Sequence, residues 1–324
     1  MAGKIALLAP SRDHLDAFAE FTPEGVEIAW VDSTQPIEQQ AAELVDTVSV
    51  IATPSEFPLE LARACPNLKL VQVVSAGTDR INLQALGELG TRVANNGGGN
   101  AVAVAEHTIA MIVGAYRKLH LQIQSVKARE WAGDIRTNWF PEAHELTDKT
   151  VGIVGLGRIG ERVARRLQGW DCTLIYTDVI NFPSELEEEL HIIRVSLDEL
   201  LKTSDVVTLH VPLNRHTRGM ISDRELALMK SSALLINACR GPVVDEAALI
   251  RALNDNEIAA AGLDVLEVEP TPADNPLLEM DNVMVTPHMA GLGPEAAAKS
   301  RAFAVQNSVM VASGEEPESV VLPE

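Results

Sequence analysis

The hydrophobic pattern of the chain alternates between short apolar runs rich in valine and isoleucine and longer amphipathic stretches. In the N-terminal part, the runs that predict strands are residues 5–9, 26–30, 48–52, 68–74 and 92–94. Strands that alternate with helices form parallel sheets, because each crossover helix returns the chain to the same end of the sheet. The pattern therefore predicts an α/β unit, and the turn-forming cluster at 95–100 predicts a hinge or a domain boundary after it.

A nearly all-apolar stretch follows this boundary, from 101 to about 121, with Asn100 placed to cap its first turn. A helix that is apolar on most faces is buried between layers or domains. The next segment, 125–148, is polar but contains large aromatic side chains: Trp131, Trp139 and Phe140. We expect an arm that packs on another subunit; a loop folded onto its own domain is the alternative.

A second alternating series begins at Thr150. Its predicted strands are 151–154, 174–177, 206–210, 233–237, 259–264 and 283–286, with a helix at 159–168. Six strands of this kind match one doubly wound dinucleotide-binding fold. A closing helix at 295–313 follows the sequence Gly291-Leu292-Gly293-Pro294, and we expect it to return to the first unit, which would make that unit discontinuous.

Composition narrows the classes of partner. The chain has 324 residues, enough for two domains, and 26 Lys and Arg against 46 Asp and Glu give a net charge of −20. This charge repels nucleic acids and anionic membranes, so a site for an anionic substrate needs its own local cation. The three cysteines, Cys65, Cys172 and Cys239, match no zinc or disulfide pattern. We expect a cytoplasmic protein with no metal site and no membrane span.

The sequence Gly155-Leu156-Gly157-Arg158-Ile159-Gly160 follows an apolar strand and opens an amphipathic helix. In this context the pattern GxGxxG binds the pyrophosphate of a dinucleotide, because glycines permit the tight turn and the close approach of the backbone. Eighteen residues after Gly160, at the end of the next strand, lies Asp178. A carboxylate there accepts hydrogen bonds from the adenosine ribose and repels a 2′-phosphate, which favours NAD over NADP.

Candidate catalytic residues follow three strands of the second series. Arg240 comes after the strand at 233–237, Glu269 after 259–264, and His288 after 283–286. The carboxyl ends of parallel strands share one edge, so we expect these side chains to face one crevice. Arg240 can hold a carboxylate and polarise a carbonyl, His288 can donate a proton, and Glu269 can orient the imidazole.

Each of these residues also has a structural explanation when taken alone. The arginine could form a salt bridge, the glutamate before Pro270 could cap a turn, and the histidine after Pro287 could simply pack. Their occurrence at three strand ends of one nucleotide-binding fold favours the catalytic interpretation.

Five segments carry a resemblance to a known family: 155–160, 210–213 with Thr217, 237–249, 263–270 and 286–288. Together they resemble the signatures of the D-isomer-specific 2-hydroxyacid dehydrogenases, and the resemblance covers nearly the whole chain. It also includes the loop Ser75–Asp79, similar to the family's substrate loop, and Asn100 with 104–106, similar to the start of its interdomain helix.

The resemblance implies two doubly wound parallel-sheet domains: a smaller, flavodoxin-like substrate-binding domain at 1–100 plus 291–324, and a Rossmann NAD-binding domain at 101–290 with a dimerisation arm at about 123–148. It implies that Arg240, Glu269 and His288 are catalytic, that Arg240 and His288 also contact substrate, and that backbone N–H groups at Ala76 and Gly77 bind the substrate carboxylate. The implied NAD contacts are Gly155, Gly157, Arg158, Ile159, Gly160, Asp178, Pro212, Ala238, Cys239 and Asp264.

The expected function is NAD-dependent interconversion of a D-2-hydroxy acid and its 2-keto acid, by hydride transfer at C2, in a cytoplasmic homodimer. Substrate would bind between the domains, and closure around the hinge at 97–99 would exclude water. One departure from the family pattern is Cys239, where Ala or Ser is more usual; a tolerated small residue is the main interpretation and a redox-sensitive thiol the minor one.

Two alternatives remain open at this stage. One is an NAD(H)-sensing interaction protein, since some relatives of this architecture act as transcriptional co-repressors. The other is a phosphoglycerate-type dehydrogenase, in a short form without a regulatory domain. Arg80 and the segment 53–58 are candidates for further substrate contacts, although an exposed arginine beside Asp79 is more often a surface charge. Neither feature identifies the substrate or the physiological direction.

Overall fold

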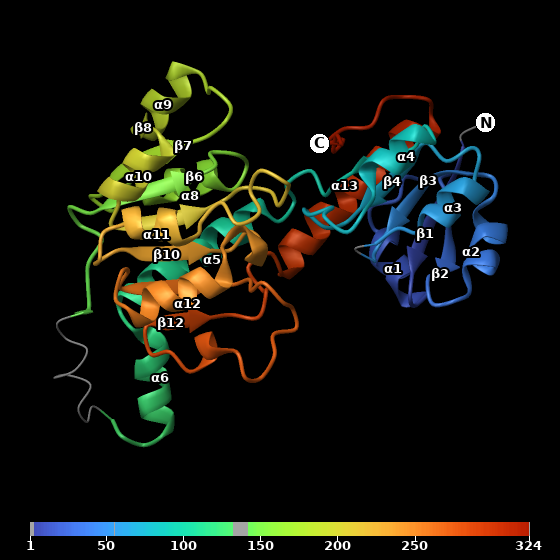
Figure 1. Ribbon diagram of the computed structural model, residues 1–324. Coiled ribbons are helices and arrows are strands. Elements are labelled where there is room, and N and C mark those ends of the chain that lie inside the picture. The colour runs from blue at the N-terminus through green and yellow to red at the C-terminus, as the bar shows by residue number, and fades with distance from the viewer. Residues whose placement is uncertain (1–2, 55, 132–141, 324) are drawn as a thin grey trace. The chain divides into compact units, whose positions relative to one another are not determined.

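The computed structural model describes residues 3–54, 56–131 and 142–323. It divides into two compact units, the first formed by Met1–Asn100 with Leu292–Glu324 and the second by Ala101–Gly291 (Figure 1). Each unit is built on its own parallel sheet.

The first unit has a five-stranded sheet in the order β2-β1-β3-β4-β5, with every neighbouring pair parallel. This is the flavodoxin-like, doubly wound order. Its strands are β1 (Lys4–Ala9), β2 (Ile28–Asp32), β3 (Thr47–Ala52), β4 (Leu70–Val73) and β5 (Arg92–Ala94). Its helices are α1 (Asp13–Ala19), α2 (Ile37–Leu44), α3 (Leu59–Ala64), α4 (Leu83–Glu88) and α13 (Pro294–Ala312).

Helix α13 completes the core of the first unit, although it comes from the far end of the chain. Its side chains Ala304 and Val305 are buried in one cluster with Ile5, Leu7 and Ile51 of the sheet. In Figure 1 this helix, in red, lies beside the blue and cyan elements of the N-terminal part. The unit is therefore discontinuous in sequence.

The second unit has a seven-stranded parallel sheet in the order β12-β11-β10-β9-β6-β7-β8. Numbered from β6, this is the Rossmann order extended by one strand. The strands are β6 (Thr150–Val154), β7 (Thr173–Thr177), β8 (Ile192–Arg194), β9 (Val206–Leu209), β10 (Leu234–Asn237), β11 (Ala260–Leu263) and β12 (Val283–Val285). The helices are α5 (Ala101–Tyr116), α6 (Leu119–Lys127), α8 (Gly160–Leu167), α9 (Ser184–Leu190), α10 (Leu197–Thr203), α11 (Asp223–Leu228) and α12 (Glu246–Asn254). The predicted fold class is confirmed.

Two details of the second unit differ from the sequence prediction. The six-strand count was wrong, because the short edge strand β8 was missed; with Ile193 61% exposed, it lacks the apolar run of the central strands. The single helix predicted from 101 to about 121 is two helices, because Lys118 has a left-handed backbone (φ 52°) between α5 and α6. The Lys118 amine is held there by Glu142, 2.7 Å away.

The predicted arm at about 123–148 lies partly outside the described residues, since 132–141, including Trp139 and Phe140, are not described. In the described part, Trp131 is 81% exposed and α6 presents Ile123 and Val126, each more than half exposed. Ile123 and Val126 contribute apolar area to the accessible surface of α6, beside the exposed Gln122, Gln124 and Lys127.

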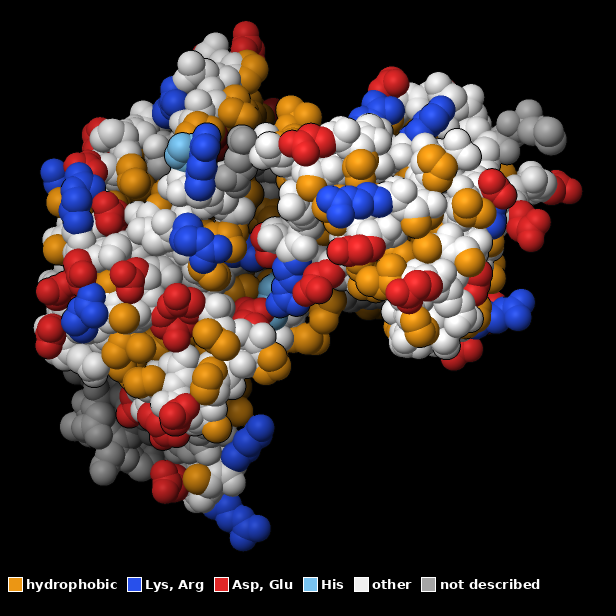
Figure 2. Space-filling view, turned by 45° about the vertical axis from the view of Figure 1, so that its right-hand side comes forward, with side chains coloured by type: hydrophobic (Ala, Val, Ile, Leu, Met, Phe, Trp, Pro, Cys, Tyr) orange, Lys and Arg blue, Asp and Glu red, His pale blue; other side chains and the backbone are white. Residues whose placement is uncertain are grey.

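The surface carries charges of both signs. On the face that Figure 2 shows, acidic and basic side chains are interspersed, and hydrophobic side chains form small scattered groups. Among residues 3–54, 56–131 and 142–323, no helix combines the length and the apolar character needed to cross a membrane.

Candidate active site

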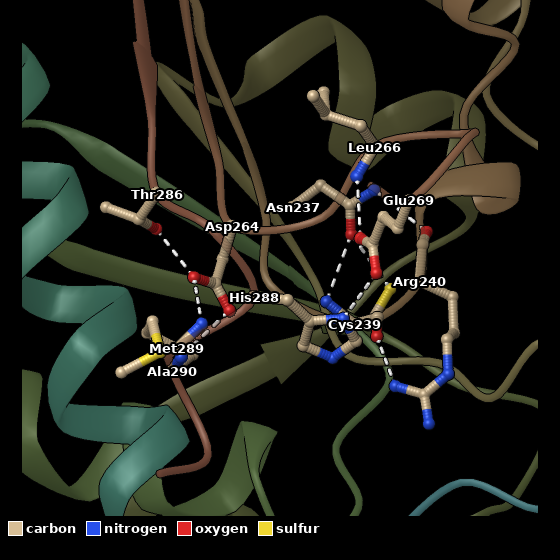
Figure 3. A network of polar contacts seen from close by, with 10 residues as sticks. All are labelled: Asn237, Cys239, Arg240, Asp264, Leu266, Glu269, Thr286, His288, Met289 and Ala290. Carbon is tan, nitrogen blue, oxygen red and sulfur yellow. Dashed lines mark hydrogen bonds and ion pairs between the residues drawn. The ribbon is translucent and has the colours of Figure 1, made fainter. Parts of the chain in front are cut away.

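Three turns of the second unit meet at the carboxyl ends of neighbouring strands. The sheet order places β12, β11 and β10 side by side, and the turns after them carry His288, Glu269 and Arg240 respectively. Because the strands are parallel, these ends share one edge of the sheet, which is where doubly wound folds bind ligands. Figure 3 shows the three side chains in one network of polar contacts.

His288 and Glu269 form a direct pair. The Nδ1 atom of His288 lies 2.6 Å from Oε2 of Glu269, and the side chains are 48% and 34% exposed. The second carboxylate oxygen, Oε1, accepts a hydrogen bond from the backbone N–H of Leu266 at 3.0 Å. Glu269 is thus fixed at both oxygens, and Nε2 is the ring nitrogen that can exchange a proton with a ligand.

Arg240 lies in the turn after β10, and this turn is braced by Asn237. The Asn237 side chain donates to the carbonyl of Arg240 at 2.9 Å and accepts from the backbone N–H of Cys239 at 3.1 Å. The Arg240 guanidinium donates to the carbonyl of Cys239 at 2.6 Å (Figure 3). A half-buried, permanently charged fork at this place can bind a carboxylate or a carbonyl oxygen.

The turn that carries His288 has an unusual backbone, with φ 53° at His288 itself. Asp264, at 1% exposure, holds this turn: its backbone carbonyl accepts from the N–H of His288 at 2.8 Å. Its side chain accepts from the N–H groups of Met289 and Ala290, each at 2.9 Å. Asp264, which the resemblance implies as a NAD contact, thus also holds the turn that carries His288.

The phosphate loop has the geometry that a bound dinucleotide needs. Gly155 has φ 93°, and a Cβ there would lie 2.6 Å from the carbonyl oxygen of His210, so only glycine fits. At Gly160 a Cβ would lie 2.1 Å from the Gly155 oxygen, whereas nothing lies within 4 Å at Gly157. The first and third glycines allow tight packing and the second leaves open space, as close approach of a pyrophosphate requires.

Asp178 directly follows β7, beside this loop. Its Oδ2 accepts from the Leu156 N–H at 2.8 Å and its Oδ1 from the Ile180 N–H at 2.9 Å. These two bonds orient the carboxylate, and each oxygen keeps a lone pair for a ribose hydroxyl. Val179 and Ile180, 98% and 60% exposed, place apolar surface next to it. The residues present therefore fit the adenosine end of NAD.

The other predicted cofactor contacts are spread around this edge of the second unit. Ile159 and Ala238 belong to a small apolar cluster with Val104 and Ala290. Arg158 and Pro212 are exposed, whereas Cys239 is buried.

The predicted substrate residues Ala76 and Gly77 belong to the first unit, in the loop after β4. Their carbonyl groups accept hydrogen bonds from Asn95 at 3.3 Å and from Ser75 at 2.8 Å. Arg80 is exposed and lies 3.6 Å from Glu56. Within the described residues, no group of three or more His, Cys, Asp or Glu side chains is arranged to hold a metal ion.

Sequence reasoning assigned no role to Asn237, His107 or Thr286, all of which belong to the polar network of the site. Asn237 could have been singled out as a polar residue ending an apolar strand. His107 carries no such signal, because it sits within the apolar pattern of α5.

Four features together define a dinucleotide-dependent enzyme: the seven-stranded Rossmann sheet, the glycine phosphate loop, the acid after the second strand and the histidine–carboxylate pair. Comparison with known proteins narrows the class. Residues 109–290 match the family described as D-isomer specific 2-hydroxyacid dehydrogenase, NAD binding domain. The chain belongs to this family, as the resemblance predicted, and it is an NAD-dependent 2-hydroxyacid oxidoreductase.

The similar proteins are of several kinds. Glyoxylate reductase of Korarchaeum cryptofilum is 34% identical over 90% of this chain and 88% of its own length. D-3-phosphoglycerate dehydrogenase of Archaeoglobus fulgidus is 37% identical over 82% of this chain, which spans about half (49%) of that longer protein. The structure of D-lactate dehydrogenase from Lactobacillus jensenii with NAD⁺ has a TM-score of 0.81 and 28% identity, covering 99% of this chain and 100% of that one.

These relatives are named as enzymes, so the co-repressor alternative is not favoured. The predicted cofactor, NAD, is confirmed by the family's NAD-binding domain and by the NAD⁺-bound neighbour.

Proposed function

We propose that this chain interconverts a small 2-keto acid and its D-2-hydroxy acid, with His288 as the acid–base residue, Glu269 as its partner and Arg240 as the cation that binds substrate. The observation that supports these roles is the 2.6 Å hydrogen bond between His288 Nδ1 and Glu269 Oε2, in the NAD-binding unit and at the strand ends that also carry Arg240. A histidine held in this way can donate a proton to a bound ligand, and accept one from it, through Nε2.

In the reducing direction, bound NADH supplies the hydride that reduces C2. His288 donates the proton on Nε2 to the carbonyl oxygen, so that C=O becomes CH–OH. Glu269 stabilises the imidazolium before the transfer and keeps its ring orientation afterwards. Arg240 binds the carboxylate and polarises the carbonyl, which supplies the local positive charge that a chain of net charge −20 otherwise lacks. Oxidation of the hydroxy acid reverses each step.

The first unit is proposed as the substrate-binding domain, with the N–H groups of Ala76 and Gly77 as carboxylate donors. The bonds from Ser75 and Asn95 engage the carbonyls of this loop and shape its backbone. The structure gives Arg80 an exposed ion pair with Glu56, which favours a surface role for it. In the segment 53–58, the hydroxyl of Thr53 donates a hydrogen bond to the backbone carbonyl of Leu8, which is a structural contact.

We further propose small 2-keto acids such as glyoxylate as substrates, because glyoxylate reductase is among the relatives that match most of the chain. A phosphoglycerate-type activity is the second candidate, since the Archaeoglobus fulgidus relative has 37% identity.

A homodimer in the cytoplasm, with no nucleic-acid or membrane partner, completes the proposal. It is supported by the exposed apolar side chains of α6 and by the net charge of −20. Light scattering compares the mass of the wild-type protein with that of the Ile123→Lys variant. A wild-type dimer that becomes a monomer in the variant supports α6 as the interface, and an unchanged mass contradicts it.

The deciding experiment measures NADH oxidation by the purified protein with glyoxylate, hydroxypyruvate, pyruvate, oxaloacetate, 3-sulfopyruvate, 3-phosphohydroxypyruvate and branched-chain 2-keto acids. We expect turnover with one small keto acid and loss of that turnover, by about a thousandfold or more, in His288→Ala with NADH binding retained. Loss of NADH binding in this variant would contradict the role of His288. If the wild-type protein turns over none of these keto acids, the result contradicts the proposed substrate class.

A further inference from the structure

A chain of hydrogen bonds connects helix α5 to the turn that carries His288. The Nε2 atom of His107, on α5, lies 3.0 Å from Oγ1 of Thr286. The same hydroxyl donates to Oδ1 of Asp264 at 2.6 Å. Figure 3 shows Thr286 and the backbone of Met289 and Ala290 converging on the Asp264 carboxylate from opposite sides.

The direction of each bond follows from counting protons. A threonine hydroxyl has one proton, and the Asp264 carboxylate, as an acceptor, takes it. The hydroxyl can then only accept from His107, so the proton of His107 lies on Nε2. The order of donation is therefore from His107 to Thr286 to Asp264.

Asp264 in turn fixes a backbone that would otherwise be unfavourable. A left-handed φ of 53° at His288 is uncommon for a residue with a side chain, and it persists only where neighbouring contacts impose it. Three hydrogen bonds do this, from the N–H groups of His288, Met289 and Ala290 to the carbonyl and carboxylate of Asp264. The direction in which the His288 imidazole points thus depends on how Asp264 is held.

We propose that His107 and Thr286 are positioning residues for His288, acting through the Asp264 carboxylate. This inference rests on the proposed acid–base role of His288. Neither residue needs to touch substrate: His107 is a quarter exposed, on a helix that precedes the catalytic turns by more than a hundred residues in sequence. Without the Thr286 hydroxyl, the Asp264 carboxylate keeps only its bonds from the Met289 and Ala290 N–H groups, and without His107 the Thr286 hydroxyl loses the bond that orients it. In either case the turn is held less firmly in one backbone conformation.

The test uses an isosteric change. Thr286→Val removes the hydroxyl and keeps the shape, Thr286→Ser restores the hydroxyl, and Thr108→Val is the matched control. Thr108 is fully buried on α5, and its hydroxyl bonds only to the helix carbonyl of Val104 in the contacts described. His107→Leu and His107→Gln form the second pair, because a glutamine amide can donate where Nε2 does.

We expect kcat, expressed per NADH-binding site, to fall about tenfold in Thr286→Val and His107→Leu, because a small misplacement of a catalytic group is costly. The keto-acid KM and the NADH dissociation constant should stay within about twofold of wild type. Thr286→Ser, His107→Gln and Thr108→Val should keep most of the wild-type kcat. A purely structural role would reduce folded protein and leave kcat per site unchanged.

Hydrogen exchange of the Met289 and Ala290 amides gives a readout that needs no turnover. We expect faster exchange in Thr286→Val than in Thr108→Val. Equal exchange, or a kcat for Thr286→Val equal to that of Thr108→Val, would overturn the positioning role. An NADH dissociation constant that rises in step with the loss of kcat would overturn it too, by assigning the network to the cofactor. If the wild-type protein shows no activity but Thr286→Val still exchanges faster than Thr108→Val, the result contradicts the proposed function alone.

Discussion

Gly241 lies directly against the carbonyl group of Leu266: a Cβ at position 241 would be 1.8 Å from that oxygen and 2.1 Å from its carbon. Gly241 follows Arg240 in the turn after β10, and the N–H of Leu266 donates to Glu269 Oε1 at 3.0 Å. The turn of Arg240 and the turn of Glu269 are therefore in contact through one glycine. Their relative position is set by the absence of a side chain.

The first prediction concerns this contact. Gly241→Ala should push the two turns apart, lower the free energy of unfolding by roughly 1–3 kcal/mol and reduce kcat. Chemical denaturation and steady-state kinetics measure the two effects. Gly169→Ala is the control in the same unit, because a Cβ there meets nothing within 4 Å. Equal behaviour of the two variants would show that the turns can separate without consequence.

The second prediction concerns the pH dependence of stability. The Nδ1 atom of His210, after β9, is buried and has no hydrogen-bond partner among the described residues, and burial lowers the pKa of His210 from 6.5 to about 3. Below pH 6.5 the unfolded chain binds a proton that the folded chain does not, so stability should fall as the pH falls. The contribution of His210 to the slope should approach about 1.4 kcal/mol per pH unit between about pH 6 and pH 4.5.

Urea denaturation of the NAD-free protein over this range, compared with His210→Gln, measures the slope. Asp245 does not contribute over this pH range, because a hydrogen bond from the Ala248 N–H lowers the pKa of its carboxyl below 3.8. His14→Gln, at an exposed position, is the control. The assignment to His210 fails if both variants keep the wild-type slope.

The third prediction concerns the choice of cofactor. Asp178→Asn removes the charge that opposes a 2′-phosphate and one of the acceptors that hold the Leu156 and Ile180 amides. NADH should bind more weakly and NADPH more tightly, with the ratio of their dissociation constants changing by about tenfold or more. Fluorescence titration with both cofactors measures the ratio. Asp171→Asn, on the exposed turn before β7, should leave it unchanged, and an unchanged ratio for Asp178→Asn would contradict its role.

The fourth prediction concerns Cys239. This residue is 8% exposed, its thiol lies 3.1 Å from Asn237 Oδ1, and burial raises the pKa of Cys239 to about 11. A thiol of this kind carries almost no thiolate at neutral pH and reacts slowly. Iodoacetamide should therefore label the half-buried Cys172 before Cys239, and Cys239→Ala should retain most of the activity. Rapid labelling of Cys239 with loss of turnover would restore the redox interpretation.

Most of the architecture could be predicted from sequence because buried parallel strands are nearly continuous apolar runs, as at 5–9 in β1 and 234–236 in β10. The edge strand β8 could not, since its exposed residues break that pattern. The turn residues Arg240, Glu269 and His288 could be singled out because they follow strands. The contact between His107 and Thr286 could not be predicted, because the two residues are 179 positions apart and only the folded chain brings them together.

The return of α13 to the first unit also constrains the order in which the protein can assemble during synthesis. The face formed by Ile5, Leu7 and Ile51 emerges from the ribosome early, whereas Ala304 and Val305, which cover it, follow roughly 250–300 residues later. At ~5–20 residues per second this is a delay of about 12–60 s. During that time the nascent first unit exposes an apolar sheet face, while the second unit, encoded in one uninterrupted stretch, can already fold. A chaperone that protects apolar strands is therefore expected to act on the N-terminal hundred residues and to leave when α13 docks.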